Sequence, residues 1–196
     1  GPVNPEKHYC LPPASRLDEQ ELRSLIQQEK YFILHAPRQT GKTSTMRNFA
    51  RQLNEEGTYT ALYVNIEGGQ VARSSYKDAL SMILQEFATR VKEQLPTQAS
   101  AILEIFENLK KESVPAGSLL ATLLSRWCAQ SEKPIVLFID EIDCLVGDSL
   151  VSVLRQIRSG YDKRPQFFPQ SICLIGVRDV RDYRIWSDEK QAMVLG

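Results

Sequence analysis

Residues 31–50 read YFILHAPRQTGKTSTMRNFA, which is an apolar run, a polar loop and an amphipathic segment in direct succession. The continuous apolar run over residues 31–34 is typical of a strand that is buried on both faces of a parallel sheet. Beyond the loop, apolar side chains recur at helical spacing and predict a helix that Gly57 ends; they are Met46, Phe49, Ala50 and Leu53. This stretch therefore predicts a strand, a loop and a helix that form one unit.

The loop in this unit matches the phosphate-binding P-loop pattern at Gly41, Lys42 and Thr43, whereas Ala36 stands where that pattern has its first glycine. Gly41 permits close approach of backbone N–H groups to phosphates, and the helix N-terminus adds a partial positive charge. Lys42 would bridge the β- and γ-phosphates, and the Thr43 hydroxyl would bind Mg²⁺. An incidental turn between strand and helix is the alternative. The candidate nucleotide-binding residues are Ala36, Pro37, Arg38, Gln39, Thr40, Gly41, Lys42, Thr43 and Ser44.

A second candidate element is the carboxylate pair Asp140-Glu141, which follows the apolar run of residues 135–139. Paired carboxylates at the end of a buried strand are costly unless a cation lies opposite, and α/β sheets bind ligands at the carboxyl ends of their strands. We expect Asp140 to hold the metal and Glu141 to orient and deprotonate the attacking water. Capping of the following helix is the alternative, and for Asp143 it is as good an explanation as a catalytic role.

Patterns on either side of these motifs predict an α/β fold. Alternating strands and helices indicate three layers around a mainly parallel sheet, with a helical insertion between the second and third strands. Residues 1–14, rich in proline, predict an extended N-terminal arm, and residues 15–196 a single domain. The other predicted strands cover 58–66 and 171–177; helices are expected over 15–30, three times within 72–132, where Pro96 and Pro115 separate them, and from about 150 to 160.

The composition excludes several classes of protein. The 196 residues include 24 basic and 24 acidic side chains, so no overall charge attracts nucleic acid or an anionic membrane. The apolar runs are far shorter than the ~20 residues of a membrane span, and no signal-peptide pattern opens the chain, which predicts a cytoplasmic protein. Four cysteines without zinc-binding spacing are expected to be buried, reduced thiols.

The two motifs together resemble Walker A and Walker B of AAA+ and related STAND ATPases, and most closely those of prokaryotic AAA-like domain ATPases. The segment 174–183 is similar to the one that follows Walker B in that family. The resemblance implies a sheet of the ASCE type, in which the fourth strand lies between the Walker A and Walker B strands, and a catalytic role for Glu141. It places Arg178 at the sensor 1 position. It also implies a core without the helical lid of complete members, for which we expect modest nucleotide binding and slow turnover.

These observations lead to a first functional hypothesis, an Mg²⁺-dependent ATPase whose bound nucleotide, ATP or ADP, switches or drives a larger protein. ATP is favoured over GTP because the chain has no Asn-Lys-x-Asp guanine motif. The alternative is a nucleotide-stabilised scaffold without significant turnover, in which the helices of residues 72–132 bind a protein partner. Phosphoryl transfer to a small acceptor and coupled handling of nucleic acid stay open.

Several further residues have both a functional and a structural explanation. Seven basic residues between Arg155 and Arg184 would suit nucleic-acid phosphates or trans arginine fingers, or simply form a solvated face. Phe167-Phe168-Pro169 would be a partner-binding wedge or would pack under its own loop. His35 would touch nucleotide or end a strand, and Cys144 lacks a nearby base and is expected to be inert.

Overall fold

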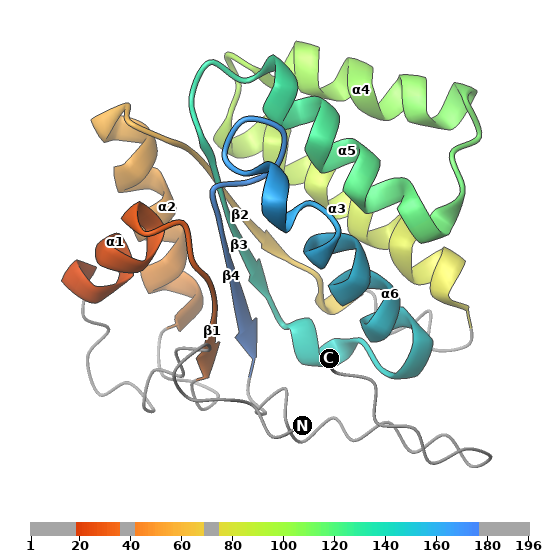
Figure 1. Ribbon diagram of the computed structural model, residues 1–196, viewed down its shortest axis with the longest axis horizontal. Coiled ribbons are helices and arrows are strands. Elements are labelled where there is room, and N and C mark those ends of the chain that lie inside the picture. Colours follow the sequence, from red (N-terminus) through yellow and green to blue (C-terminus); the bar gives the residue numbers. More distant parts are fainter. Residues whose placement is uncertain (1–18, 36–41, 69–74, 177–196) are drawn as a thin grey trace.

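The fold is an α/β arrangement of four strands and six α-helices in the described part of the chain (Figure 1). The computed structural model describes residues 19–35, 42–68 and 75–176. Along the chain, the elements are α1 (Glu19–Gln27), β1 (Tyr31–His35), α2 (Lys42–Glu56), β2 (Thr60–Asn65), α3 (Tyr76–Gln94), α4 (Ala99–Lys111), α5 (Ala116–Gln130), β3 (Ile135–Asp140), the 3₁₀ turn η2 (Ile142–Cys144), α6 (Gly147–Arg158), the 3₁₀ turn η3 (Tyr161–Lys163) and β4 (Ser171–Gly176).

All pairings between the described strands are parallel, and the strand order is β1-β4-β3-β2. Tyr31, the first residue of β1, pairs with Ile172, and Leu62 pairs with Leu137 near the middle of β2 and β3. β4 therefore lies between β1 and β3, the two strands that precede the candidate motifs. This confirms the strand order that the family resemblance implies.

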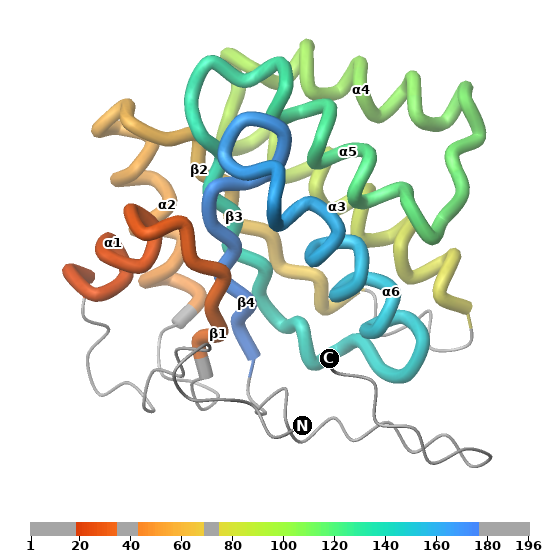
Figure 2. Tube along the Cα trace, in the orientation of Figure 1, coloured from red at the N-terminus to blue at the C-terminus, as the bar shows by residue number. Residues whose placement is uncertain are grey.

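Alternation of side chains along the strands gives the sheet two apolar faces. Figure 2 shows that helices lie on both sides of the sheet. One face carries Phe32, Tyr63 and Phe138 and packs against α1 and α2. The opposite face carries Leu62 and Leu137 and packs against α3, α5 and α6. The three-layer architecture predicted from the sequence is confirmed, because the apolar strands are covered by helices on both faces.

The predicted helical insertion consists of α3, α4 and α5, and it connects β2 to β3. Pro96 lies between α3 and α4, and Pro115 is the N-cap of α5, as proline's inability to continue a helix predicts. The side chain of Gln156 on α6 accepts from the Leu120 N–H at 2.8 Å and donates to the Ala116 carbonyl at 3.1 Å. These contacts fix the insertion to the helix that follows the candidate carboxylates.

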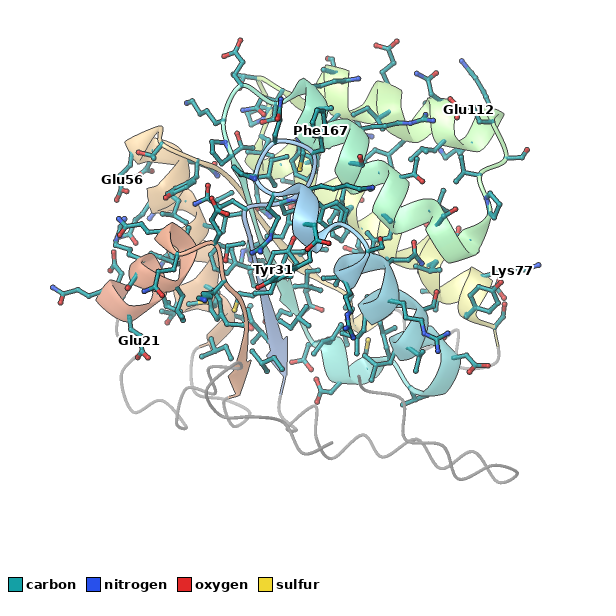
Figure 3. All side chains as sticks on the ribbon, in the orientation of Figure 1. Glu21, Tyr31, Glu56, Lys77, Glu112 and Phe167 are labelled. Atoms are coloured by element: carbon teal, nitrogen blue, oxygen red, sulfur yellow. The ribbon has the colours of Figure 1, made fainter. Side chains whose placement is uncertain are left out.

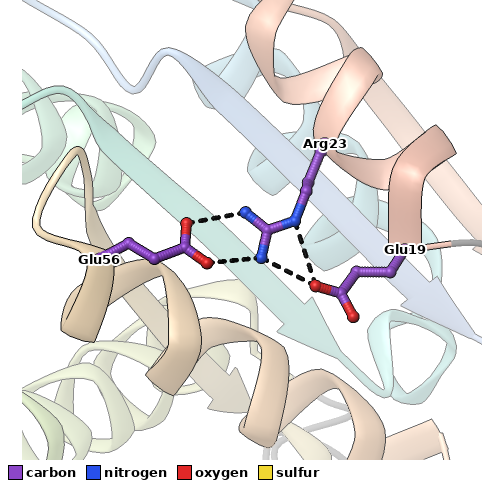
Figure 4. A network of polar contacts seen from close by, with 3 residues as sticks. All are labelled: Glu19, Arg23 and Glu56. Atoms are coloured by element: carbon purple, nitrogen blue, oxygen red, sulfur yellow. Dashed lines mark hydrogen bonds and ion pairs between the residues drawn. The ribbon is translucent and has the colours of Figure 1, made fainter.

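On the other face, a polar network joins α1 to α2 at the surface (Figure 4). The Arg23 guanidinium donates to both carboxylate oxygens of Glu56, at 2.7 and 2.8 Å, and to Glu19 one turn before it. The guanidinium holds the pKa of Glu56 below its ordinary value. The network orients α1 on α2, the helix that begins at the candidate phosphate loop.

Some predicted boundaries were wrong by a few residues. The first helix ends at Gln27 rather than at residue 30, because Glu29 has a left-handed backbone (φ 57°) and the Lys30 N–H turns back to the Leu25 carbonyl. β2 begins at Thr60 rather than at residue 58, since the Thr60 N–H makes its first bond to the neighbouring chain segment, at the Pro134 carbonyl. The predicted arm of residues 1–14 and the end of the last strand at residue 177 lie outside the described residues.

Candidate functional site

Asp140 is the last residue of β3 and is completely buried. It follows Val136 and Phe138 at two-residue spacing, and these two side chains face α2, so the Asp140 carboxylate lies on the same side of the sheet. Its backbone carbonyl accepts from the Ile66 N–H at 3.1 Å. The buried strand thus delivers a carboxylate to the carboxyl edge of the sheet, beside the start of α2.

Thr43, in the first turn of α2, meets this carboxylate. Its Oγ1 donates to Oδ2 of Asp140 over 3.2 Å, although the two residues are far apart in the sequence. The structure therefore brings together the two side chains that sequence analysis assigned to Mg²⁺. The contact also places the start of α2, and with it the end of the candidate phosphate loop, against the end of β3.

Tyr63 on β2 is a third member of the site, and sequence analysis missed it. Its hydroxyl donates to the same Asp140 oxygen, Oδ2, over 2.5 Å. Burial raises the pKa of Tyr63 well above its ordinary value, and the bond to Asp140 raises it further, so the phenol keeps its proton and acts as donor. No local sequence pattern marks Tyr63, because its place near Asp140 comes from the pairing of β2 with β3, in which Asn65 pairs with Asp140.

The backbone of Tyr63 is itself held by α3. The Gln94 amide accepts from the Tyr63 N–H at 3.0 Å and donates to the Tyr63 carbonyl at 2.7 Å. These are the two groups that a further strand would bond on the outer edge of β2. One helix of the insertion therefore fixes the strand position from which the phenol reaches Asp140.

Glu141 has a left-handed backbone, with φ 60° and ψ 37°, which is uncommon for a residue with a side chain. Its N–H donates to Oδ1 of Asp140 at 2.8 Å, and its carbonyl accepts from the Cys144 N–H at 2.9 Å. Although Glu141 occupies the N-cap of η2, its side chain makes no capping hydrogen bond. The capping explanation is therefore not supported for Glu141, whose sharp turn sets the direction of the chain beyond the sheet.

Asp143 and Cys144, which follow Glu141 in the sequence, both contact the ends of strands or the residues just after them. Asp143 lies against the end of β4, since a Cβ on Gly176 would approach its Oδ1 to 3.2 Å. Cys144 is buried and donates from Sγ to the Ile66 carbonyl at 3.0 Å. Burial, together with the charges of Asp143 and Glu141, raises the pKa of Cys144 to about 12, so this thiol stays protonated at neutral pH, in keeping with an inert role.

The phosphate-loop residues are only partly described. Ala36, Pro37, Arg38, Gln39, Thr40 and Gly41 lie outside the described residues. Lys42 begins α2, and Ser44 is exposed in the same turn as Thr43. His35 ends β1, where it pairs with Gly176 at the end of β4. The loop thus leaves β1 and enters α2 at the edge of the sheet where Asp140 lies.

The oxygen atoms of Thr43 and Asp140 fit a magnesium site. Mg²⁺ prefers oxygen ligands, keeps several waters and is commonly held by one or two protein groups together with substrate phosphates. The hydroxyl and carboxylate oxygens, 3.2 Å apart, offer such a partial set next to the candidate phosphate loop. Among residues 19–35, 42–68 and 75–176, no group of three or more His, Cys, Asp or Glu side chains is placed to hold a metal. Water and phosphate oxygens would supply the remaining ligands of a magnesium ion held by these two groups.

Comparison with known protein families identifies the family of this chain. The sequence model described as "AAA domain" matches residues 23–183, which include β1, Thr43, Asp140 and β4. The chain belongs to the AAA domain family. This AAA domain is a P-loop NTPase module for nucleotide binding. A search of curated proteins finds no match. In the described part of this chain, none of the helices combines the length and the apolar character that a membrane span needs.

The aromatic and basic residues that the sequence also singled out lie partly at the surface and partly in the core. Phe168 is buried, whereas Phe167 is 46% exposed on the loop between α6 and β4 (Figure 3). Packing under the loop therefore applies to one of the two rings. Arg164 stacks on Tyr161, with its guanidinium carbon 3.5 Å from the ring centroid, so within the predicted basic patch it has a structural role. Arg178, Arg181 and Arg184 lie outside the described residues.

The surface of the helical insertion gives no support for an apolar docking face. Its apolar side chains, such as Ile105 and Trp127, are buried in the core. In the described part of residues 72–132, Tyr76 is the one large hydrophobic side chain that is exposed. The predicted protein partner of this segment stays a prediction.

Proposed function

We propose that this AAA domain binds ATP with Mg²⁺ and hydrolyses it, as a nucleotide-driven switch or motor module of a larger protein. The observation that carries the proposal is the contact between Thr43 at the start of α2 and the buried Asp140 at the end of β3. A buried carboxylate beside an incoming phosphate loop suits a site that binds a metal with its phosphates.

Each candidate residue has a role in this proposal. The backbone of residues 36–41 and the side chain of Lys42 would bind the phosphates. Thr43 and Asp140 would hold Mg²⁺, which when bound neutralises charge on the phosphate oxygens. Glu141 would orient a water for in-line attack on the γ-phosphate and accept its proton, while Lys42 stabilises the charge that develops.

The backbone of Glu141 supports its assignment. Left-handed geometry at a residue with a side chain costs of order 1–3 kcal/mol and is found preferentially at functional sites. Here the strained residue directly follows Asp140, at the carboxyl edge where α/β sheets bind ligands. The backbone geometry is therefore in keeping with a functional role for the residue that follows Asp140.

Two substitutions test the proposal. Lys42→Ala removes the phosphate-binding ammonium and is expected to weaken binding of a fluorescent ATP analogue by about 10-fold or more. Glu141→Gln keeps the shape of the side chain but cannot accept a proton, so we expect binding to be retained and phosphate release to fall by about 10²-fold or more. Matched controls are Lys77→Ala and Glu104→Gln, both exposed on the helical insertion.

The outcomes separate the candidate functions. Unchanged affinity in Lys42→Ala would contradict the assigned nucleotide site. Analogue binding by the wild-type protein with no release of phosphate that depends on Glu141 would contradict hydrolysis and favour the nucleotide-stabilised scaffold. Equal losses in the control variants would show that the effects are not specific to the site.

A further inference from the structure

The hydrogen bonds of Asp140 are unevenly divided between its two oxygens. Oδ2 accepts from both the Tyr63 and the Thr43 hydroxyls, at 2.5 and 3.2 Å, and Oδ1 accepts from the Glu141 N–H at 2.8 Å. A carboxylate offers about four lone-pair sites. Three of these are used by donors from the described residues. Both donors on Oδ2 are hydroxyl groups, and one of them, on Thr43, is itself assigned to the metal.

A hydroxyl carries one hydrogen and two lone pairs, so Thr43 can donate to Asp140 and still offer a lone pair to a metal. The bond from Thr43 is the longer of the two on Oδ2, at 3.2 Å, and Asp140 itself is buried at the end of β3. A buried carboxylate that loses a donor is strongly destabilised unless another donor remains. Tyr63 is the closer donor, and it holds Oδ2 in place.

We propose that Tyr63 is a positioning residue that holds the Asp140 carboxylate in its metal-binding orientation. The inference rests on the proposed function, because it assigns Tyr63 to the same metal site. Tyr63 acts through Asp140, to which its hydroxyl donates.

The surroundings of Tyr63 suit this role. Its ring lies within the apolar cluster that also contains Phe49 and Phe138, so its position is fixed by packing. Its backbone is fixed by the two bonds to Gln94. A phenylalanine would fill the same volume, and only the hydroxyl reaches Asp140. The phenol is therefore a donor held at one place by the fold rather than by the ligand.

Tyr63→Phe is the test, with Tyr31→Phe as the matched control. Tyr31 lies on β1, and its hydroxyl donates to the Pro169 carbonyl at 2.8 Å, away from Asp140. Binding of a fluorescent ATP analogue is measured first in EDTA and then during titration with Mg²⁺. We expect Tyr63→Phe to match the wild type in EDTA but to need roughly 10-fold more Mg²⁺ for half-maximal response, as for other residues that orient a metal ligand. Tyr31→Phe should follow the wild type in both.

The results distinguish this inference from the proposed function. A wild-type protein that binds no analogue, or whose binding ignores Mg²⁺, would overturn the proposed function. A wild-type response to Mg²⁺ with the same half-point in Tyr63→Phe would overturn the inference alone. A loss of affinity in EDTA equal to the loss with Mg²⁺ would also overturn it, since that pattern indicates a general structural role.

A second measurement keeps the hydroxyl in place in case Tyr63→Phe does not fold. 3-Fluorotyrosine is introduced at position 63 alone, and its ¹⁹F resonance is followed in the nucleotide complex. The resonance is expected to shift when Mg²⁺ is added, because a metal held at Asp140 changes the charge on the oxygen that accepts from the Tyr63 hydroxyl. A resonance that stays in place on addition of saturating Mg²⁺ would contradict the inference.

Discussion

Asp140 shows how a single residue depends on distant parts of the chain. Its described donors come from β2, from the start of α2 and from its own following peptide group. Hydrogen bonds to a charged group contribute about 1.5–3 kcal/mol each, and an unsatisfied buried carboxylate costs more than that. The carboxylate is therefore stable in the core because three separate segments supply donors to it.

At the residue scale, local sequence patterns point to most residues of the candidate site but not to all of them. Lys42, Thr43, Asp140 and Glu141 stand in local patterns whose spacing points to phosphate and metal chemistry. Tyr63 stands in no such pattern, because its role depends on the pairing of β2 with β3. The left-handed backbone of Glu141 is equally invisible in the sequence, since it arises from the bonds to Asp140 and Cys144.

Gly160 gives a prediction at the same scale. A Cβ at this position would lie 2.1 Å from the ring of Phe168, which is buried. Gly160→Ala should therefore displace the ring and lower the free energy of unfolding by about 1–3 kcal/mol in urea titration. Gly117→Ala on α5 is the control, since no atom lies within 4 Å of its added methyl group. A loss in Gly160→Ala no larger than in Gly117→Ala would show that the Phe168 ring moves without cost.

At the scale of elements, the outer edge of β2 is covered by side chains. The Asn54 amide on α2 bonds the N–H and the carbonyl of Ala61, both at 2.8 Å, and Gln94 on α3 does the same for Tyr63. Unpaired strand edges invite association with other chains. Two helices on opposite faces of the sheet therefore close this edge with one amide each.

We expect substitution of either amide to weaken this edge. Asn54→Leu and Gln94→Met keep approximate size but leave one backbone N–H and one carbonyl unpaired, which should lower the free energy of unfolding by about 1–3 kcal/mol each. Asn48→Leu and Gln85→Met are controls at exposed positions on the same two helices. Light scattering should also show faster aggregation of the edge variants. Stabilities equal to those of the controls would mean that water replaces the amides at no cost.

Element types were predicted well, and element ends less well. The strands and helices follow from apolar runs and helical periodicity, which are local properties of the chain. Their ends follow from partners that lie elsewhere: β2 begins where Pro134 supplies a carbonyl, and α1 ends where Glu29 turns left-handed. When the end of an element depends on another segment of the chain, the residues of the element itself do not show where it ends.

At the scale of the whole molecule, one sheet separates two apolar clusters but belongs to both. Cys128 lies in the cluster under α3, α5 and α6, and Cys173 lies in the cluster under α1 and α2. Because each central strand contributes side chains to both clusters, neither can lose its packing without disturbing the other. We therefore expect the described part of the chain to unfold as one cooperative unit.

The cysteines provide the measurement. Burial raises the pKa values of Cys128 and Cys173 well above the ordinary thiol value, so both should be unreactive toward a disulfide reagent in the folded protein. Two variants are made in a Cys10→Ser, Cys144→Ala background. One retains only the Cys128 thiol, and the other retains only the Cys173 thiol. Both should become reactive at the same concentration of guanidinium chloride. Separate midpoints would show that the two faces of the sheet unfold independently.

The sequence by itself determined the kinds of element, the three-layer class, and the residues at which phosphate and metal chemistry would be expected, because strand burial, helical periodicity and the phosphate-loop pattern are encoded within short stretches. The tertiary structure alone decided that the Thr43 hydroxyl reaches Asp140, that Tyr63 shares the same oxygen, and that Gln94 closes the edge beside it. The physical reason is that a buried carboxylate takes its donors from whichever segments the strand order brings alongside, and strand order is a property of the folded sheet.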